Sequence, residues 1–313
     1  MSPPPAIDFA PGPTPRLWAI VGATGTGKSD LALELAAALR ERGNAAEIVN
    51  ADAMQLYRGM DIGTAKLPVD ERRGIPHRLF DVREVAEEAA AAWYQPLARD
   101  EISRIHAAGG DAILVGGSGL YVSSVIFDFR FPPRDEDLRS RLEHELEQHG
   151  AAALFARLQA QDPATAARID PKNGRRLVRA LEVLAQGAVT HGAALPDVPL
   201  LWRPDTRIIG LHVDRAELVE RLDRRVERMW SDGLIAEVRA LRERGLDDGV
   251  TARRAIGYAQ AIAQLDGATS EAEAVAETQT LTRRYARRQV SWFKRYPGIE
   301  WHDAPVDAAT LLS

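Results

Sequence analysis

GATGTGKS (22–29) is the most informative motif in this chain of 313 residues. It matches the pattern G-x-x-x-x-G-K-[ST], follows the apolar run LWAIVG (17–22) and precedes SDLALELAAALRERG (29–43), whose leucines recur every four residues. A buried strand, a glycine-rich turn and a helix in this order are the setting in which the pattern binds phosphate. The backbone N–H groups of the turn and the N-terminus of the helix surround the anion. The sequence therefore predicts a phosphate site here, without specifying ATP.

Strand and helix signals alternate along the following residues. The segments that read as strands are AAEIVNAD (45–52), HRLFDV (77–82) as an edge element, AILVGG (112–117) and RIIGLHV (207–213). A helical segment covers 87–109, and Pro96 within it should mark a break or a fresh start, because proline cannot donate a helical hydrogen bond. Strands that alternate with helices predict a parallel sheet covered by helices.

An all-helical insertion interrupts this pattern. Strand signals stop near 129–138, charged helical segments continue to about Gln186, and long helices follow the strand at 207–213 up to about Tyr296. We predict an α/β fold: a P-loop NTPase-like parallel sheet core with C-terminal basic helices (16–129 and 199–313) and an inserted helical domain (130–198). Residues 1–15 contain six prolines and are expected to form a flexible leader.

The composition excludes several classes of protein. There are 40 Lys+Arg against 45 Asp+Glu, so the net charge of −5 does not suit a generally cationic nucleic-acid coat. The chain has no cysteine, which excludes disulfides, thiolate metal sites and a cysteine nucleophile. Its apolar runs are shorter than the roughly 18 residues that a membrane helix needs, so we expect no membrane association.

An acidic residue ends the predicted strand at 45–52. Nucleotide hydrolases usually have a magnesium-binding Asp after an apolar strand, but AILVGGSGLY (112–121) continues with Gly-Gly-Ser, which makes ATP hydrolysis doubtful. Because ligands gather at the carboxyl ends of parallel strands, Asp52, the 22–29 loop and Ser118 should meet in one crevice. Asp52 could serve catalysis there, or it could equally be a cap or turn residue.

DAMQLYRGMDIGTAK (52–66), just after the GATGTGKS loop, resembles the tRNA dimethylallyltransferase family, also called tRNA isopentenyltransferases. The likeness runs in collinear order through PHRLFD (76–81), LVGGSGLY (114–121), DPATAARIDPKNGRRLVRALEV (162–183), RLDRRVERMWSDGLIAEV (221–238), ARRAIGY (252–258) and RRYARRQVSWFKR (283–295). It covers nearly the whole chain. Family members often have Ser at the position of Ala53 and Pro at that of Ala23, and neither difference removes a charged group.

The resemblance implies transfer of the dimethylallyl group from dimethylallyl diphosphate to N6 of the adenosine 3′ to the anticodon, in tRNAs reading codons that begin with U. It implies Asp52 as the base that takes the amino proton, with Lys28 and Arg225 completing the catalytic set. The donor-binding residues would be Gly22, Ala23, Thr24, Gly25, Thr26, Gly27, Lys28, Ser29, Arg221 and Arg225. Mg²⁺ is the expected cofactor, held in part by the Ser29 hydroxyl.

Spacing alone leaves other roles open for some of these residues. Arg221 and Arg225 share one helix face and could grip a diphosphate, but a solvated basic stripe has the same spacing. Thr24 and Ser118 match positions that line the substrate channel in the family, but both hydroxyls could equally be hydrogen-bonded within their own loops. The resemblance favours Arg225, and less firmly Arg221, as diphosphate ligands.

The segment 283–295 contains six Arg/Lys, no acid and three aromatic residues, the composition that binds unstacked RNA bases. An amphipathic helix with its aromatics in the core is the alternative, which we expect to hold in part for Trp292. The resemblance implies tRNA contacts for Asp52, Ala53, Met54, Gln55, Ser118, Arg139, Arg175, Arg176, Arg179, Arg254, Gly257, Tyr258, Arg287, Arg288, Gln289, Trp292 and Lys294. Gln55 could read the adenine edge, and the target base must leave its stack.

Three rival functions are compatible with parts of the sequence. A P-loop small-molecule kinase would leave the basic segment 252–295 without a purpose, and an adenylate isopentenyltransferase would have less need of the insertion. A non-catalytic RNA-binding protein would leave Lys28 and Asp52 unexplained. The seven histidines form no HExxH motif, so a histidine-based zinc site is not expected. We expect a monomer of the bacterial, cytoplasmic type, acting on the tRNA anticodon stem-loop.

Overall fold

A computed structural model describes residues 16–128, 130–187 and 199–312, so the expected leader and part of the expected insertion lie outside the described residues. The chain divides into two compact units: residues before 129 together with those after 198, and residues 129–198. The strands are β1 Leu17–Gly22, β2 Ala46–Asn50, β3 His77–Arg78, β4 Asp111–Gly116, β5 Arg207–His212 and β6 Ile299–Asp303. The α-helices are α1 Lys28–Glu41, α2 Ala91–Ala107, α3 Gly119–Ile126, α4 Glu136–Gln161, α5 Pro163–Ala166, α6 Gly174–Ala185, α7 Arg215–Ser231, α8 Leu234–Arg242, α9 Tyr258–Leu265 and α10 Glu271–Phe293. Short 3₁₀ helices cover η1 Asp70–Arg72, η2 Leu246–Asp248, η3 Ala252–Arg254 and η4 Ala308–Leu312.

The larger unit is built on a six-stranded parallel sheet with the order β3-β2-β4-β1-β5-β6. All residues of β1 and β4 are buried, which accounts for their unbroken apolar sequences. Val21 pairs with Gly116 and Gly22 with Leu211, so the strands end at about the same level. The loop 22–29, the residues after Asn50 and those after Gly116 therefore leave the sheet at one edge.

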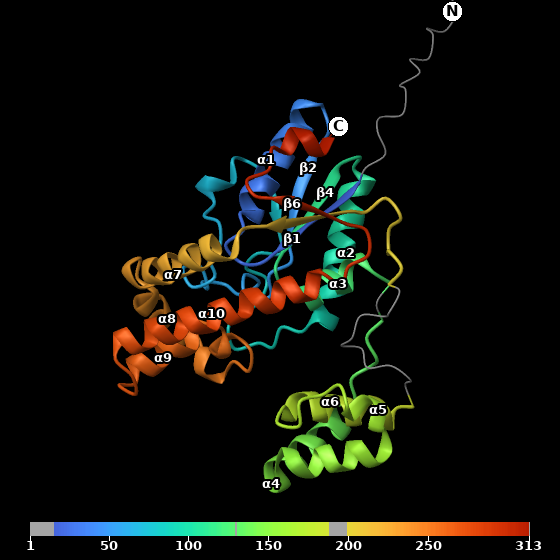
Figure 1. Ribbon diagram of the computed structural model, residues 1–313, viewed down its shortest axis with the longest axis vertical. Helices are drawn as coiled ribbons and strands as arrows, with labels where there is room; N and C mark the ends of the chain where they lie inside the picture. The colour runs from blue at the N-terminus through green and yellow to red at the C-terminus, as the bar shows by residue number, and fades with distance from the viewer. Residues whose placement is uncertain (1–15, 129, 188–198, 313) are drawn as a thin grey trace, which may run out of the picture. The chain divides into compact units, whose positions relative to one another are not determined.

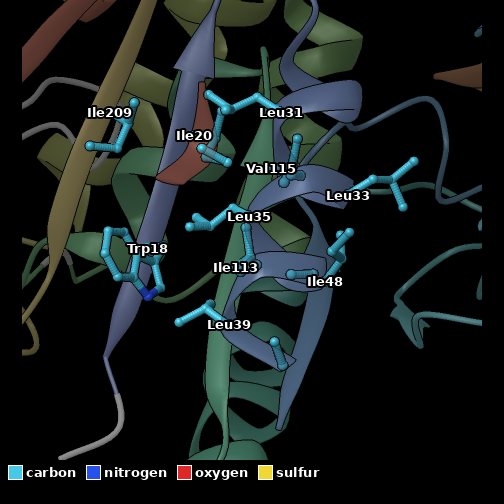
Figure 2. Packing of buried hydrophobic residues seen from close by; sticks show 14 of the residues in the cluster. Trp18, Ile20, Leu31, Leu33, Leu35, Leu39, Ile48, Ile113, Val115 and Ile209 are labelled. Atoms are coloured by element: carbon cyan, nitrogen blue, oxygen red, sulfur yellow. The ribbon is translucent and has the colours of Figure 1, made fainter. Parts of the chain in front are cut away.

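Helix α1 packs on the sheet through the leucines whose spacing predicted it. Figure 2 shows Leu31, Leu35 and Leu39 directed at the sheet residues Ile20 and Ile113, and all five are at least 96% buried. Each such side chain contributes roughly 1.5–3 kcal/mol when fully buried. This packing fixes the start of α1, and with it the turn that precedes the helix.

Three details differ from the sequence-based expectations. Pro96 does not interrupt α2, which continues through it, so the expected break is wrong. An interior proline costs a helix about 3 kcal/mol, because it removes one hydrogen bond and crowds the carbonyl four residues earlier. Burial of Tyr94, Ala98, Ile102 and Ile105 on the same helix offsets that cost. Strand β6 was not predicted: its sequence IEWHD alternates weakly and it occupies the outer edge of the sheet, half exposed. The edge element predicted at 77–82 is a strand only at His77–Arg78.

The smaller unit is helical and has a core of its own. Its helices α4, α5 and α6 bury a set of leucines, with Leu154, Leu158 and Leu177 fully buried. Asp162 accepts a hydrogen bond from the Thr165 amide and so caps the start of α5.

Four helices follow β5 in the larger unit. Helix α10 packs against α7, α9, α3 and β1, and Figure 1 shows it running alongside α7 and α9 and on toward α3. In the described ranges, no helix combines the length and the apolar character needed to cross a membrane.

Candidate active site

The loop 22–29 forms an anion cradle. Gly25 and Gly27 have φ of 82° and 85°, a region that L-residues rarely adopt, so glycine is required at both positions. Thr26 Oγ1 donates to the Ala23 carbonyl at 2.8 Å, and Lys28 Nζ donates to the same carbonyl at 2.6 Å. The ammonium group of Lys28 is thus held at the loop. An incoming anion can replace the Ala23 carbonyl as the acceptor of its hydrogen bond.

Arg225 on α7 reaches this loop. Its Nη1 donates to Thr24 Oγ1 at 3.1 Å, and its Nη2 donates to the Thr64 carbonyl at 3.2 Å. Arg221, four residues earlier, instead pairs with Glu217 on its own helix. Of the two arginines expected at the diphosphate, the structure places Arg225 at the loop, whereas Arg221 pairs within its helix.

Asp52 lies beside the same loop, on the turn that follows β2. Its Oδ1 accepts from the Met54 amide at 2.9 Å, and its own amide donates to Asn50 Oδ1 at 2.9 Å. The next amide, that of Ala53, donates to Ser118 Oγ at 3.1 Å. Asp52 is therefore a turn residue, one of the two roles left open, and only one carboxylate oxygen is used in that turn. The turn that carries Asp52 thus meets Ser118 through the neighbouring Ala53 amide.

The charges of this site act on one another. Burial lowers the pKa of Lys28 to about 8, although the Asp52 carboxylate opposes the shift, and Arg225 lowers it further. Burial also lowers the pKa of Arg225, and Asp52 again opposes the effect. Burial raises the pKa of Tyr285 to about 12, and the negative charge of Asp52 adds to that rise. The carboxylate of Asp52 is thus the shared counter-charge of two cations held beside a phosphate-type loop.

This arrangement suits transfer of a group from a phosphorylated donor. The loop amides and two cations stabilise a leaving anion, and a carboxylate beside them can accept a proton from the attacking atom.

Comparison with known proteins identifies the family. The IPP transferase family model matches residues 55–296. The chain belongs to the IPP transferase family.

Relatives and solved structures agree with this family assignment. A tRNA dimethylallyltransferase from Clavibacter sepedonicus is 59% identical over 289 residues, covering 92% of this chain and 94% of that protein. The corresponding protein of Kineococcus radiotolerans is 53% identical, covering 94% and 92%. The structure of a full-length tRNA isopentenylpyrophosphate transferase from Bacillus halodurans matches with a TM-score of 0.65 and 39% identity, covering 92% of this chain and 89% of that one. A eukaryotic dimethylallyltransferase captured acting on tRNA matches with a TM-score of 0.73 and 26% identity, covering 93% and 74%.

The magnesium expected for this IPP transferase would have few protein ligands. In the described ranges, no cluster of three or more His, Asp or Glu side chains could hold a metal ion. Mg²⁺ bound to a diphosphate commonly takes one or two protein oxygens and completes its shell with phosphate oxygens and water. The exposed Ser29 at the start of α1 supplies such an oxygen. The residues present therefore fit a magnesium held mainly by the donor.

The residues expected to contact RNA divide between surface and interior. Exposed ones are Arg175, Arg176, Arg254, Arg287, Arg288 and Lys294; buried ones are Ala53, Gly257, Tyr258 and Gln289; half-buried ones are Asp52, Met54, Gln55, Ser118, Arg139, Arg179 and Trp292. Arg139 and Arg179 both pair with the buried Glu182, which gives these two arginines a structural role in the helical unit. Trp292 Nε1 donates to Ser123 Oγ at 3.0 Å, which agrees with the expectation that this side chain belongs in part to the core.

The side chains of Gln289 and Tyr258 are buried and contact protein, and the RNA contact expected of them stays a prediction. Gln289 is 4% exposed; it accepts from the Thr24 amide and donates to the Gly117 carbonyl, both at 2.8 Å. It thereby joins the phosphate loop to the loop after β4. The fully buried Tyr258 donates to Glu237 Oε1 at 2.5 Å. The spacing of Gln289 from Ala286 and Phe293 marks a buried helix face and could have indicated its interior position, whereas its hydrogen-bond partners carry no such signal.

Gln55 is held beside the site but already has partners. Its Nε2 donates to the carbonyls of Thr64, at 3.1 Å, and Ala65, at 3.4 Å. The carbonyl oxygen of its amide is left to accept a hydrogen bond from an amino group such as that of adenine. The role expected of Gln55 therefore remains a prediction.

Proposed function

We propose that this IPP transferase moves the dimethylallyl group of dimethylallyl diphosphate to N6 of the adenosine 3′-adjacent to the anticodon in tRNAs reading codons that begin with U. The products are N6-isopentenyladenosine and diphosphate. The observation that carries the proposal is the charge cluster at the loop 22–29: Arg225 donates to Thr24, Lys28 donates to the Ala23 carbonyl, and the negative charge of Asp52 acts on both cations. Relatives more than 50% identical are named as tRNA dimethylallyltransferases.

In the proposed reaction the allylic C–O bond breaks and a C–N bond forms. The bonding pair of the broken bond leaves with the diphosphate, whose growing negative charge is stabilised by the loop amides, Lys28 and Arg225. Mg²⁺, held by Ser29 and the diphosphate oxygens, would supply further positive charge to the leaving group. The N6 amino group loses one proton as it bonds to carbon, and the Asp52 carboxylate accepts that proton.

The acceptor would be held by basic residues on the outer side of α10 and by the helical unit. Arg287 and Arg288 are exposed on α10 and Lys294 just after it, and Arg175 and Arg176 are exposed at the start of α6. Such groups pair with phosphates, and binding then weakens as salt concentration rises. We further propose that the enzyme works as a monomer in the cytoplasm.

The test is a transfer assay with purified protein, Mg²⁺ and radiolabelled dimethylallyl diphosphate. We expect label in an unmodified anticodon stem-loop that carries adjacent adenosines 3′ to the anticodon, and little in AMP. A stem-loop with guanosine at the target position is the matched control. Equal rates on AMP and the stem-loop would favour an adenylate isopentenyltransferase, and phosphate transfer from ATP to a small acceptor would favour a kinase.

A further inference from the structure

Arg225 and Gln55 are held by one common atom, the carbonyl oxygen of Thr64. Arg225 Nη2 donates to it at 3.2 Å and Gln55 Nε2 at 3.1 Å. In the proposed function the first residue binds the donor and the second binds the acceptor. The position of the Thr64 carbonyl therefore sets the geometry of both sides of the reaction.

The segment that presents this carbonyl is a tight turn. Thr64 Oγ1 donates to the Met60 carbonyl at 2.6 Å, and Ala65 has a positive φ of 48°. Lys66, whose side chain is 3% exposed, closes the turn by bonding Asp61 Oδ1 at 2.7 Å and Asp81 Oδ1 at 2.6 Å. A turn with so many bonds presents its carbonyl in one direction.

Glu237, on α8, holds this turn from outside. Its carboxylate accepts from the backbone amides of Asp61, Ile62 and Gly63, at 3.2, 2.8 and 3.4 Å. A carboxylate facing three consecutive amides is a strong charge-assisted contact. Residue 237 lies more than 170 positions along the chain from these amides.

Tyr258 contacts both Glu237 and the turn that Glu237 holds. Its hydroxyl donates to Glu237 Oε1 at 2.5 Å. Its ring packs on Gly63 so closely that a Cβ there would lie 2.4 Å from a ring carbon. Burial raises the pKa of Tyr258 well above its usual value, and the neighbouring charge of Glu237 adds to the effect. The hydroxyl therefore remains a donor that fixes the orientation of the carboxylate.

We propose that Glu237 and Tyr258 are a positioning pair: they hold the turn 60–66 so that the Thr64 carbonyl aligns Arg225 at the phosphate loop and Gln55 beside Asp52. Neither side chain touches substrate. The roles of Arg225 and Gln55 rest on the proposed function, but the contacts that position them do not.

The test measures binding of inorganic pyrophosphate by calorimetry and the kinetics of prenyl transfer to the stem-loop. Glu237→Gln replaces the carboxylate by an amide whose NH₂ opposes the backbone donors, so we expect pyrophosphate affinity and kcat each to fall about tenfold. Glu243→Gln, an exposed position just after α8, is the matched control and should change neither. Tyr258→Phe keeps the ring on Gly63 and should give a smaller loss in the same direction, which decides the matter if Glu237→Gln does not fold.

A double-mutant cycle separates positioning from general stability. If Glu237 acts through Arg225, then Glu237→Gln adds little further loss of pyrophosphate affinity in an Arg225→Ala background. Full additivity, or unchanged pyrophosphate affinity in folded Glu237→Gln and Tyr258→Phe, would overturn the proposal. If the wild-type protein binds pyrophosphate but transfers no prenyl group, the proposed function fails, and the binding measurements still decide whether the pair positions Arg225.

Discussion

Replacing Gln289 by leucine tests how the phosphate loop is held in place. The Gln289 amide bridges the Thr24 N–H and the Gly117 carbonyl, both at 2.8 Å; the bond to Gly117 is buried and the bond to Thr24 is half-buried. Leucine has a similar volume but neither donor nor acceptor. A Cβ on Gly117 would lie 2.2 Å from the Gln289 Nε2, so the contact is too tight for water to replace the lost bonds.

The size of the expected destabilisation follows from the two backbone groups that lose their partner, the Thr24 N–H and the Gly117 carbonyl. Each unsatisfied buried backbone group costs about 1–3 kcal/mol, so the loss of both partners should lower the free energy of unfolding by about 2–6 kcal/mol in Gln289→Leu. At about 2–4 °C per kcal/mol for a unit of this size, Tm should fall by roughly 4–24 °C. Pyrophosphate affinity should also fall, because the Thr24 amide belongs to the loop that binds the anion.

The assay is thermal denaturation with and without pyrophosphate, beside a matched variant of the same helix. Gln279 on α10 donates only long hydrogen bonds, at 3.4 Å to the Asp223 carbonyl and 3.3 Å to Glu227. Gln279→Leu should change stability by less than about 0.5 kcal/mol. Equal melting temperatures for the two variants would refute the reasoning that the Gln289 amide holds the loop.

Three further predictions concern charged groups. Asp52→Ala should abolish prenyl transfer while sparing stem-loop affinity, since the carboxylate accepts a proton and is not needed to bind RNA; loss of affinity would make Asp52 a recognition group. Because burial holds the pKa of Lys28 near 8, pyrophosphate affinity should be level below that pH and fall above it as the amine loses its charge, and Lys28→Met, titrated alongside, should lack this added fall. Glu182→Ala should destabilise the helical unit by about 3 kcal/mol, because Arg139 and Arg179 lose their buried counter-charge; unchanged hydrogen exchange in α4 and α6 would contradict this.

Local patterns were sufficient for the core of the fold. The strand, turn and helix around 22–29 each depend on neighbours within a few residues, so composition and spacing identify them. The convergence of the loop 22–29 with the residues after Asn50 and Gly116 could be anticipated as well, since parallel strands bring their carboxyl ends to one edge. Strand β6 was not predicted, because an exposed edge strand shows little alternation of apolar and polar residues.

The supporting contacts of the site could not be predicted in the same way. The bond between Thr24 and Gln289 joins residues 265 positions apart, and that between Arg225 and Thr64 spans 161. The helical period can place Gln289 on the buried face of α10, but no local pattern indicates that the loop 22–29 is its partner. A polar residue acquires such a role only from the partner that the fold brings to it, as Glu237 does from three amides.

Helix α10 has a basic composition that predicts RNA binding and a helical spacing that marks a buried face. Its basic composition predicted an RNA-binding surface, yet Ala286, Gln289 and Phe293, spaced three and four apart, are buried, while Arg287 and Arg288 between them are exposed. Composition averages over both faces of a helix, whereas the helical period separates them. The segment 283–295 therefore braces the phosphate loop with one face and offers cations to RNA with the other. Substitution of Gln289 should change the stability of the loop, whereas substitution of the neighbouring Arg288 should change RNA affinity.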